Sequence, residues 1–279
     1  RKKFGIKTKY RALGTNYGKY DNKFIAEYEE VVVSCDSFSY QDFLEIRNLN
    51  FMYYAVFSLN FQKWFFQFLR TLNIKLSDFF VRFVKPDRNQ DWPKGYLEFI
   101  DNLNNAIENE LHDTKEDVVS SLKKIYKENN DDVGEPSRIN VSIGSKLIYQ
   151  EKDWIEEVLL KHLDNIMENK TTKENRNLAQ LLIDLGKHER INLKDMTEKK
   201  TMNFSYDVIS WKEGKFKQPL TNFKMNTKPI NFIIDDLRIT QVENFNKRFK
   251  SNKSDDFYYA AMDFITPRSC LMYILSYDN

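Results

Sequence analysis

The chain has 279 residues, of which 41% are hydrophobic and 30% are charged. This composition is typical of a soluble globular protein with about one or two domains, which needs no disulfide or metal to fold. Its 43 basic and 41 acidic side chains nearly cancel, which argues against a dedicated nucleic-acid binder. Only 8 glycines and 6 prolines are present, which argues against an all-β fold and a glycine-rich nucleotide-binding fold.

Neither cysteine has metal-binding spacing, so Cys35 and Cys270 are interpreted as small core residues in a reducing, cytoplasmic setting, although a disulfide between them stays open. The longest uncharged run, between Arg47 and Lys63, is shorter than the about 20 residues that span a bilayer. We therefore expect no membrane span, and no secretory signal is visible. The first residue is Arg and not Met, which favours a piece of a longer protein.

The N-terminal part of the chain predicts a β-hairpin followed by aromatic-rich helices. Residues 5–35 are rich in β-branched and aromatic side chains, with a turn within 17–22. Ser39 and Asp42 have the spacing of a capping box that begins a helix. Apolar periodicity predicts further helices over 61–72, 77–84, 97–111 and, after a second capping box at Thr114 and Asp117, 114–125.

Two polar segments, 85–93 and 131–138, interrupt these patterns, and the second is the strongest internal boundary. After it, 139–149 is interpreted as a short strand or an irregular passage. Two amphipathic helices are then expected, over 154–167 and 178–186. Strands are predicted at 201–211 and 229–234, with a loop between these two strands. The chain should end with a helix capped by Thr240 and Glu243 and running to Lys250, a helix at 254–264, and an apolar tail from Cys270.

These elements together predict a mainly α fold of the α+β kind, with small β elements near the N- and C-termini. Two domains are expected. Residues 1–90 would form a β-hairpin with aromatic-rich helices, and residues 91–279 would form a helical domain with a small C-terminal β element.

The search for catalytic motifs finds no nucleotide-binding glycine loop, no nucleophile elbow and no paired histidines. The three histidines, His112, His162 and His188, each fall on a predicted helix, and a structural role is favoured for each. Adjacent carboxylates are explained as solvated turns or helix ends, because side chains at i and i+1 diverge. Lysines at 199–200 and at 212, 215 and 217 alternate with aromatic residues at 204–216, which fits a solvated strand face better than a site that binds anionic groups.

One stretch, residues 17–74, has a more specific pattern. It holds a Tyr-Asp-Asn turn at 20–22, a glutamate-rich strand at 27–33, Ser-Tyr-Gln-Asp at 39–42 and a Phe-rich helix carrying Arg47. With these features it resembles the region that follows the catalytic barrel in cobalamin-binding-domain radical SAM proteins. The tail is similar as well, with its apolar strand, its helix beginning near Thr240 and its terminal apolar segment.

The chain departs from that family at Ser34 and Cys35, where Thr is usual, and at Phe38, where Met or Leu is usual. The resemblance implies a parent enzyme that uses an iron–sulfur cluster, S-adenosylmethionine and cobalamin. This chain has neither C-x-x-x-C-x-x-C nor D-x-H-x-x-G, so the resemblance implies no catalytic, cofactor-binding or metal-binding residue in it. Its partners would be the N-terminal catalytic and cobalamin-binding modules of the same parent, and its role would be to cap the substrate site and exclude water.

Two residues are candidates for contact with a substrate under this interpretation. Arg47 stands in a mostly apolar helix, where a buried guanidinium needs an anionic partner, and Asp42 is the nearest acidic candidate. The plainer interpretation is a helix-capping carboxylate and an arginine that extends from the edge of the core.

Three hypotheses for function follow. The first is an accessory, substrate-capping region of a cobalamin-dependent radical SAM enzyme, not catalytic in isolation. The second is a free-standing helical module that binds a partner protein through an exposed aromatic surface. The third is an unfamiliar transferase that acts on a phosphorylated sugar through the lysine-rich segment 199–228.

Overall fold

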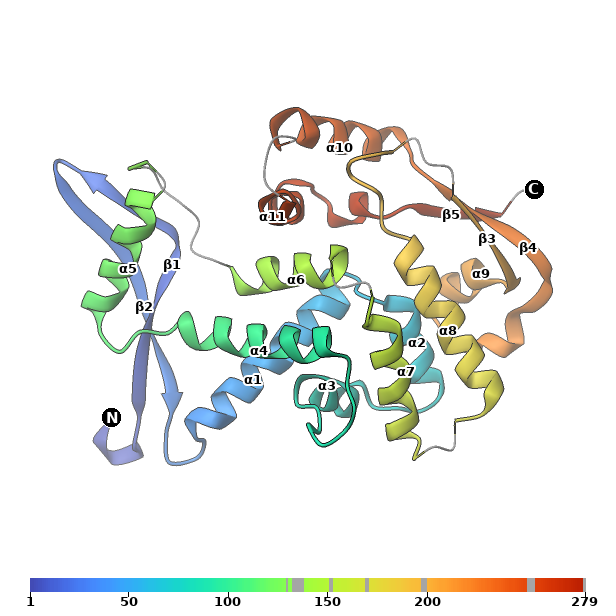
Figure 1. Cartoon of the computed structure of the whole chain (residues 1–279), viewed down its shortest axis with the longest axis horizontal. Helices are drawn as coiled ribbons and strands as arrows, with labels where there is room; N and C mark the ends of the chain where they lie inside the picture. The colour runs from blue at the N-terminus through green and yellow to red at the C-terminus, as the bar shows by residue number, and fades with distance from the viewer. Residues whose placement is uncertain are drawn as a thin grey trace. The chain divides into compact units, whose positions relative to one another are not determined.

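The computed structural model describes residues 1–128, 130–131, 138–150, 153–168, 171–196, 200–249 and 254–277. Over these residues the fold is mainly α, with a two-stranded sheet near the N-terminus and a three-stranded sheet completed near the C-terminus (Figure 1), as the sequence predicts. None of the described helices is long and apolar enough to cross a membrane.

The elements follow one another as a hairpin, a long series of helices and a mixed C-terminal part. The strands are β1 (Lys7–Tyr20), β2 (Lys23–Ser34), β3 (Lys200–Tyr206), β4 (Lys224–Ile233) and β5 (Ile274–Tyr277). The α-helices are α1 (Tyr40–Tyr53), α2 (Lys63–Thr71), α3 (Leu76–Val84), α4 (Lys94–Asn109), α5 (Lys115–Glu128), α6 (Ile139–Tyr149), α7 (Ile155–Ile166), α8 (Lys173–His188), α9 (Val208–Glu213), α10 (Asp236–Phe249) and α11 (Ser254–Phe264). Short 3₁₀ segments lie at Lys2–Phe4, Leu220–Phe223 and Arg268–Leu271, and a π turn lies at Tyr54–Ser58.

The chain forms two compact units that are each discontinuous in sequence. The first unit contains residues 1–52 and 97–143, and the second contains 53–96 and 144–279. The passages from one unit to the other fall within α1, α4 and α6. This division differs from the predicted one at residue 90, because a local pattern does not reveal which distant helix buries the hairpin.

The hairpin of the first unit turns through Asp21 and Asn22, whose φ angles are 46° and 61°. Positive φ at both central residues is what a two-residue turn needs if its twist is to match that of the strands. Antiparallel pairing then continues from Tyr20 with Lys23 to Lys7 with Ser34. The predicted hairpin and its turn are confirmed.

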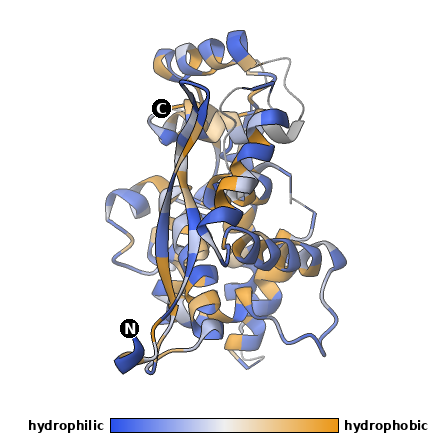
Figure 2. Ribbon diagram, turned by 90° about the vertical axis from the view of Figure 1, so that its left-hand side faces the viewer, coloured by the Kyte–Doolittle hydropathy of each residue, from blue (hydrophilic) through white to orange (hydrophobic). Residues whose placement is uncertain are grey.

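One face of this hairpin packs on α5. Val118 and Leu122 of the helix join Tyr17 of the strand in a buried cluster, and they contact partly buried aromatic residues, among them Phe24 and Tyr126, whose ring centroids are 5.6 Å apart. Hydrophilic and hydrophobic residues are interspersed along both strands (Figure 2). An isolated two-stranded hairpin is marginally stable in water, so α5 supplies the apolar surface that it needs.

Both predicted capping boxes are present in the first unit. The Asp42 N–H donates to Ser39 Oγ over 3.1 Å, and the Ser39 N–H donates back to the Asp42 carboxylate over 2.7 Å. Thr114 and Asp117 repeat this exchange at the start of α5. Each box satisfies two backbone donors that a helix terminus otherwise leaves unpaired.

The second unit is built around an aromatic core. Helices α2 and α3 and the start of α4 supply fully buried rings, packed mostly edge to face: Trp64, Phe65, Phe66, Phe79, Phe80, Phe83 and Tyr96. Leucines of α7 and α8, predicted as amphipathic helices, are buried in the same unit. The apolar series read from the sequence as buried helices is therefore confirmed.

The sheet of the second unit has the order β3-β4-β5, with antiparallel pairing throughout. The terminal strand β5 is tied to β3 by Tyr277, whose hydroxyl donates to the Tyr206 carbonyl over 3.0 Å and accepts from the Val208 N–H over 3.2 Å. Burial raises the pKa of Tyr277 to about 12. Strand β4 begins at Lys224, earlier than the predicted start at residue 229, because it pairs with β3 from there.

The segment 139–149, interpreted as a strand or irregular passage, is the helix α6. Its apolar side chains are buried on several sides, including Ile139, Val141, Leu147 and Ile148. Short apolar runs do not distinguish a buried strand from a buried helix, so burial here overrides the β-branched preference. The predicted break at 131–138 lies largely outside the described residues.

The helix predicted to begin at Thr240 begins earlier, as α10 from Asp236. The Arg238 N–H donates to the Asp235 carboxylate over 3.0 Å, so Asp235 caps the helix and Thr240 lies inside it. Asp is at least as good an N-cap residue as Thr. Sequence alone does not reveal this cap, because Asp235 and Asp236 together fit a solvated pair of adjacent carboxylates. The helix predicted at 254–264 is confirmed.

We predict that Ser39→Ala lowers the free energy of unfolding by about 1 kcal/mol, because it removes the side-chain partner of the Asp42 N–H. Ser120→Ala is the matched control, since Ser120 is exposed inside α5 and should change stability by less than about 0.5 kcal/mol. Urea unfolding monitored by circular dichroism measures both. Equal effects of the two substitutions would contradict the capping role.

Candidate functional site

The structure does not bring together the two predicted substrate-side residues, Asp42 and Arg47. Asp42 accepts hydrogen bonds from Ser39 as the acidic member of the capping box. Arg47 instead forms its ion pair with Glu110, a residue that lies far along the chain in the same unit. The predicted pairing of Arg47 with Asp42 is therefore wrong, because Glu110, in the turn that follows α4, supplies the counter-charge.

Glu110 connects two arginines in the first unit. One of its oxygens accepts from Arg47, and the other lies 3.5 Å from Arg11, which also pairs with Glu29 of β2. The side chains of Arg47 and Glu110 are 24% and 25% exposed, so the pair is partly desolvated. The charges alternate and each has a partner, which is the arrangement of a structural network.

The histidines also have structural surroundings. His162 is buried, stacks on Trp92 with ring centroids 4.5 Å apart, and shares a 2.9 Å hydrogen bond with the hydroxyl of Tyr96. Burial, with Arg82 and Lys161 nearby, lowers the pKa of His162 to about 3. His112 lies outside α4, contrary to prediction, because its backbone pairs with that of Tyr10.

The cysteines are both free thiols. Cys270 is buried, as predicted, and burial raises the pKa of its thiol. Cys35 does not lie in the core, contrary to prediction. It lies at a turn, and a hydrogen bond with Ser37 lowers the pKa of its thiol. Within the described part of the chain, no three His, Cys, Asp or Glu side chains gather closely enough to hold a metal ion.

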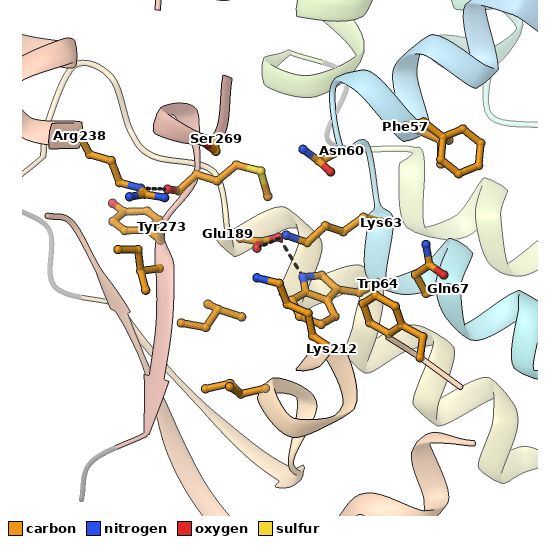
Figure 3. A pocket seen from close by; sticks show the side chains of 16 residues that line it. Phe57, Asn60, Lys63, Trp64, Gln67, Glu189, Lys212, Arg238, Ser269 and Tyr273 are labelled. Carbon is orange, nitrogen blue, oxygen red and sulfur yellow. Dashed lines mark hydrogen bonds and ion pairs between the residues drawn. The ribbon is translucent and has the colours of Figure 1, made fainter. Parts of the chain in front are cut away.

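The strongest candidate site is a cavity of about 450 Å³ in the second unit, here called the Lys63–Glu189 pocket. It is lined by residues from the π turn, α2, the end of α8, α9 and the C-terminal segment: Val56, Phe57, Asn60, Lys63, Trp64, Gln67, Glu189, Ile209, Lys212, Phe216, Arg238, Ser269, Met272, Tyr273, Ile274 and Leu275. Figure 3 shows charged side chains from these separate segments converging on one space. π turns occur often at functional sites, which adds weight to this cavity.

Glu189 is the buried centre of this pocket. Its carboxylate accepts from Lys63 Nζ over 2.5 Å and from Trp64 Nε1 over 2.9 Å (Figure 3). Its side chain is 4% exposed, and its backbone carbonyl accepts from the Tyr273 N–H. The two side-chain donors are consecutive residues at the start of α2, where the helix dipole also favours a negative charge.

Of the two remaining cations of the pocket, Arg238 has an ion-pair partner and Lys212 has none among the described residues. Arg238 donates to the Met272 carbonyl over 2.7 Å and pairs with Asp235 over 2.8 Å. Lys212 is exposed and makes no ion pair with any described residue. Burial lowers the pKa of Lys63, Glu189 raises it, and the nearby charge of Lys212 lowers it.

Aromatic side chains lie beside these charges, because Trp64, which donates to Glu189, belongs to an aromatic cluster. Trp64 and Trp211 stack with centroids 6.4 Å apart, and Phe216 packs edge-on against both. Ile274 of β5 also lines the pocket and is 37% exposed. The pocket can therefore hold an anionic group near Lys212 and an apolar body beside the aromatic rings.

Sequence reasoning missed most of this pocket. Lys63 interrupts a run of buried aromatic residues, as Arg47 interrupts an apolar helix, so the same argument would have identified it. Glu189 and Arg190 follow an amphipathic helix with no local sign of burial. Lys212 was identified only as part of the lysine-rich segment, because nothing in the sequence indicates which helices face it.

Two comparisons of the sequence with known proteins find no match. No protein-family model matches the chain, and no curated protein matches it in sequence. Its chemistry must therefore be argued from its own residues.

We predict that Glu110→Gln lowers the free energy of unfolding by about 1 to 3 kcal/mol, because it leaves Arg47 and Arg11 partly desolvated without their shared carboxylate. Glu108→Gln is the matched control, since Glu108 is exposed in the last turn of α4, two residues before Glu110. Chemical unfolding of the two variants measures the difference. A loss no larger than the control's would mean that solvent screens the network.

We predict that His162 makes the fold acid-sensitive. Its folded pKa is about 3 against 6.5 when unfolded, so the stability it contributes is complete above pH 6.5 and is lost as pH falls toward 3. The loss is about 1.4 kcal/mol per pH unit within that window. His162→Gln should therefore lose less stability than the wild type between pH 6.5 and about 4.5.

Ser120→Ala gives the control for this pH dependence, because it changes an exposed and uncharged side chain. It should retain the wild-type slope of unfolding free energy against pH. Urea titrations at several pH values measure all three slopes, and carboxylates that titrate in the same range are common to the three proteins. If His162→Gln and the wild type have parallel slopes, then His162 is charged in the folded state.

Proposed function

We propose that this chain is the accessory, substrate-capping region of a cytoplasmic, cobalamin-dependent radical SAM enzyme, and that its Lys63–Glu189 pocket binds an anionic part of the substrate. The observation that carries the proposal is the excess of cations around a single buried carboxylate. Lys63 and Trp64 already satisfy Glu189, which leaves the charge of Lys212 facing the cavity. A phosphate or carboxylate would complete this arrangement.

The position of the pocket in the sequence supports the link to that family. Phe57, Asn60, Lys63, Trp64 and Gln67 line the cavity, and all five lie in the stretch 17–74 that carries the resemblance. Under the proposal, the most family-like part of the chain also supplies one wall of the binding site.

The described residues of this chain do not fit an iron–sulfur cluster, because no group of ligands gathers in them. The proposal therefore assigns the cluster, S-adenosylmethionine and cobalamin to the N-terminal catalytic and cobalamin-binding modules as partners. When bound there, they would supply the radical and methyl-group chemistry. The residues of this chain would bind the substrate, orient it and exclude water.

The second candidate function is a transferase that acts on a phosphorylated sugar. It is favoured by the position of Lys212 and Phe216, which belong to the lysine-rich segment 199–228 and both line the pocket. The two candidates share an anionic ligand and differ in turnover. Only the transferase would convert a substrate without the other modules.

We predict that phenyl phosphate, which joins an anionic group to an apolar ring, binds the full chain and that Lys212→Met weakens binding about tenfold, because a charged hydrogen bond is lost. Lys217→Met is the matched control, since Lys217 is exposed in the same segment but does not line the pocket. Isothermal titration calorimetry measures both affinities. Equal affinities of the two variants would place the anion elsewhere.

Two further measurements distinguish the candidate functions. Incubation of the chain with phosphorylated sugars should give no product if it is an accessory region, and turnover would overturn that proposal in favour of the transferase. The gene upstream of Arg1 should encode a spaced cysteine triad, and the full-length protein should show cluster and cobalamin absorbance. A start codon close to Arg1 would contradict the accessory role.

A further inference from the structure

A second, smaller cavity lies in the same unit as the Lys63–Glu189 pocket and has different walls. Its volume is about 20 Å³. It is lined by Phe61, Gln62, Leu147, Ile148, Ile155, Gly186, Lys187 and Arg190. About 10 to 15 Å³ of such space holds one water, so a single water-sized or halide-sized particle fits, whereas phosphate and sulfate are too large.

Arg190 brings a positive charge to this cavity. The residue is 9% exposed, and its guanidinium donates one hydrogen bond, from Nη2 to the Leu59 carbonyl. Among the described residues, no carboxylate forms an ion pair with it. Its sequence neighbour Glu189 is bound instead by Lys63 and Trp64 in the larger pocket. The Glu189 charge still acts on Arg190 through space, but no carboxylate of the described residues contacts the guanidinium. A buried cation without a contacting anion is costly, so this site favours a counter-ion.

Gln62 brings an unsatisfied amide to the same cavity. The residue is 6% exposed, and its Oε1 is buried with no hydrogen-bond partner among the described residues. It is held there by backbone in the left-handed region, with φ 46°, immediately before α2. Buried polar side chains are nearly always hydrogen-bonded, so an unpaired one lining a cavity points to a bound particle.

Gly186 of α8 preserves the space for this amide. A Cβ atom at this position would lie 2.4 Å from Gln62 Oε1, closer than real contacts come, and 3.0 Å from its Cδ, so the Gln62 amide would have to move. Glycine inside a helix is less favourable than alanine, so its presence here has a steric reason. Gly186 therefore lowers the intrinsic stability of α8 but leaves space for the side chain of Gln62.

We propose that this cavity binds a single chloride ion, held by the Arg190 guanidinium and the Gln62 amide N–H₂. The two orientations of an amide are nearly equivalent in shape, so Gln62 can turn its nitrogen toward an anion. The other walls are mostly apolar (Phe61, Leu147, Ile148 and Ile155), and they favour a monovalent, weakly hydrated ion. Lys187, the second cation at the cavity, is already paired with Glu156 and Asp184.

This inference goes beyond the proposed function, because it concerns a different cavity and a different ligand. Its test uses the full chain and sodium chloride, sodium bromide or sodium gluconate at equal ionic strength. The melting temperature should rise saturably with chloride and bromide and stay constant with gluconate, which is too large for the cavity. Crystals soaked in bromide should show an anomalous peak beside Arg190.

Gln62→Glu is the decisive variant. It places a carboxylate of nearly the same shape beside Arg190, so the protein gains an internal counter-ion and its melting temperature should no longer depend on halide. Lys212→Met is the matched control, because it removes a cation of the larger pocket and should keep the wild-type halide response. The two variants separate this site from the proposed substrate pocket.

Three outcomes would overturn the proposal. One is a wild-type melting temperature that is the same in chloride and gluconate. Another is loss of the halide response in Lys212→Met with its retention in Gln62→Glu, which would place the ion in the larger pocket. The third is a peak with no anomalous signal beside Arg190 in the bromide-soaked crystal, which would identify the particle as water.

Discussion

The buried carboxylate of Glu189 is the interaction on which the second unit most depends. It joins the segment after α8 to the first turn of α2, and its backbone carbonyl fixes Tyr273 just before β5. Removing one member of a buried ion pair usually costs about 3 to 5 kcal/mol, because the other charge stays desolvated. The same contact that stabilises the core therefore also determines where Lys63 and Trp64 face the pocket.

The two units solve the problem of buried charge differently. In the first unit, Glu110 lies between Arg11 and Arg47, Glu29 adds a second carboxylate, and partial exposure allows water to screen what remains. In the second unit, Lys63 and Glu189 are more deeply buried, Arg238 is paired with Asp235, and Lys212 has no ion pair among the described residues. The first arrangement is complete without a ligand, whereas the second leaves positive charge to be balanced. For this reason we propose the ligand-binding site in the second unit, although Arg47, a candidate predicted from sequence, lies in the first unit.

The elements that local chemistry determines were predictable from sequence. The hairpin turn at 20–22 and the capping boxes at Ser39 and Thr114 depend on neighbouring residues, and all are confirmed. The helical structure of segment 139–149 was not predictable from sequence, because only tertiary burial decides between strand and helix for a short apolar segment. The composition of the two units was also not accessible, since it depends on which distant helix covers the hairpin.

The candidate site was harder to predict for the same reason, because its ion pairs join residues that are far apart in sequence. Arg47 could be recognised as a cation in an apolar helix, but its partner Glu110 could not. Lys63 has the same local signature, and Glu189 has none. The sequence does show charged residues within apolar segments, such as Arg47 and Lys63. Each of them needs a partner of opposite charge from elsewhere in the chain.

The adjacent residues Glu189 and Arg190 each need a separate partner of opposite charge, because they face different cavities. Both lie just beyond the end of α8, where the helix dipole favours a cation and disfavours a carboxylate. Consecutive side chains diverge, so the two charges line different cavities and cannot satisfy each other directly. Glu189 is compensated by donors at the start of α2, which also favours negative charge. Arg190 lines a cavity where Gln62 supplies polarity but no charge, and this asymmetry is the reason to expect an anion beside it.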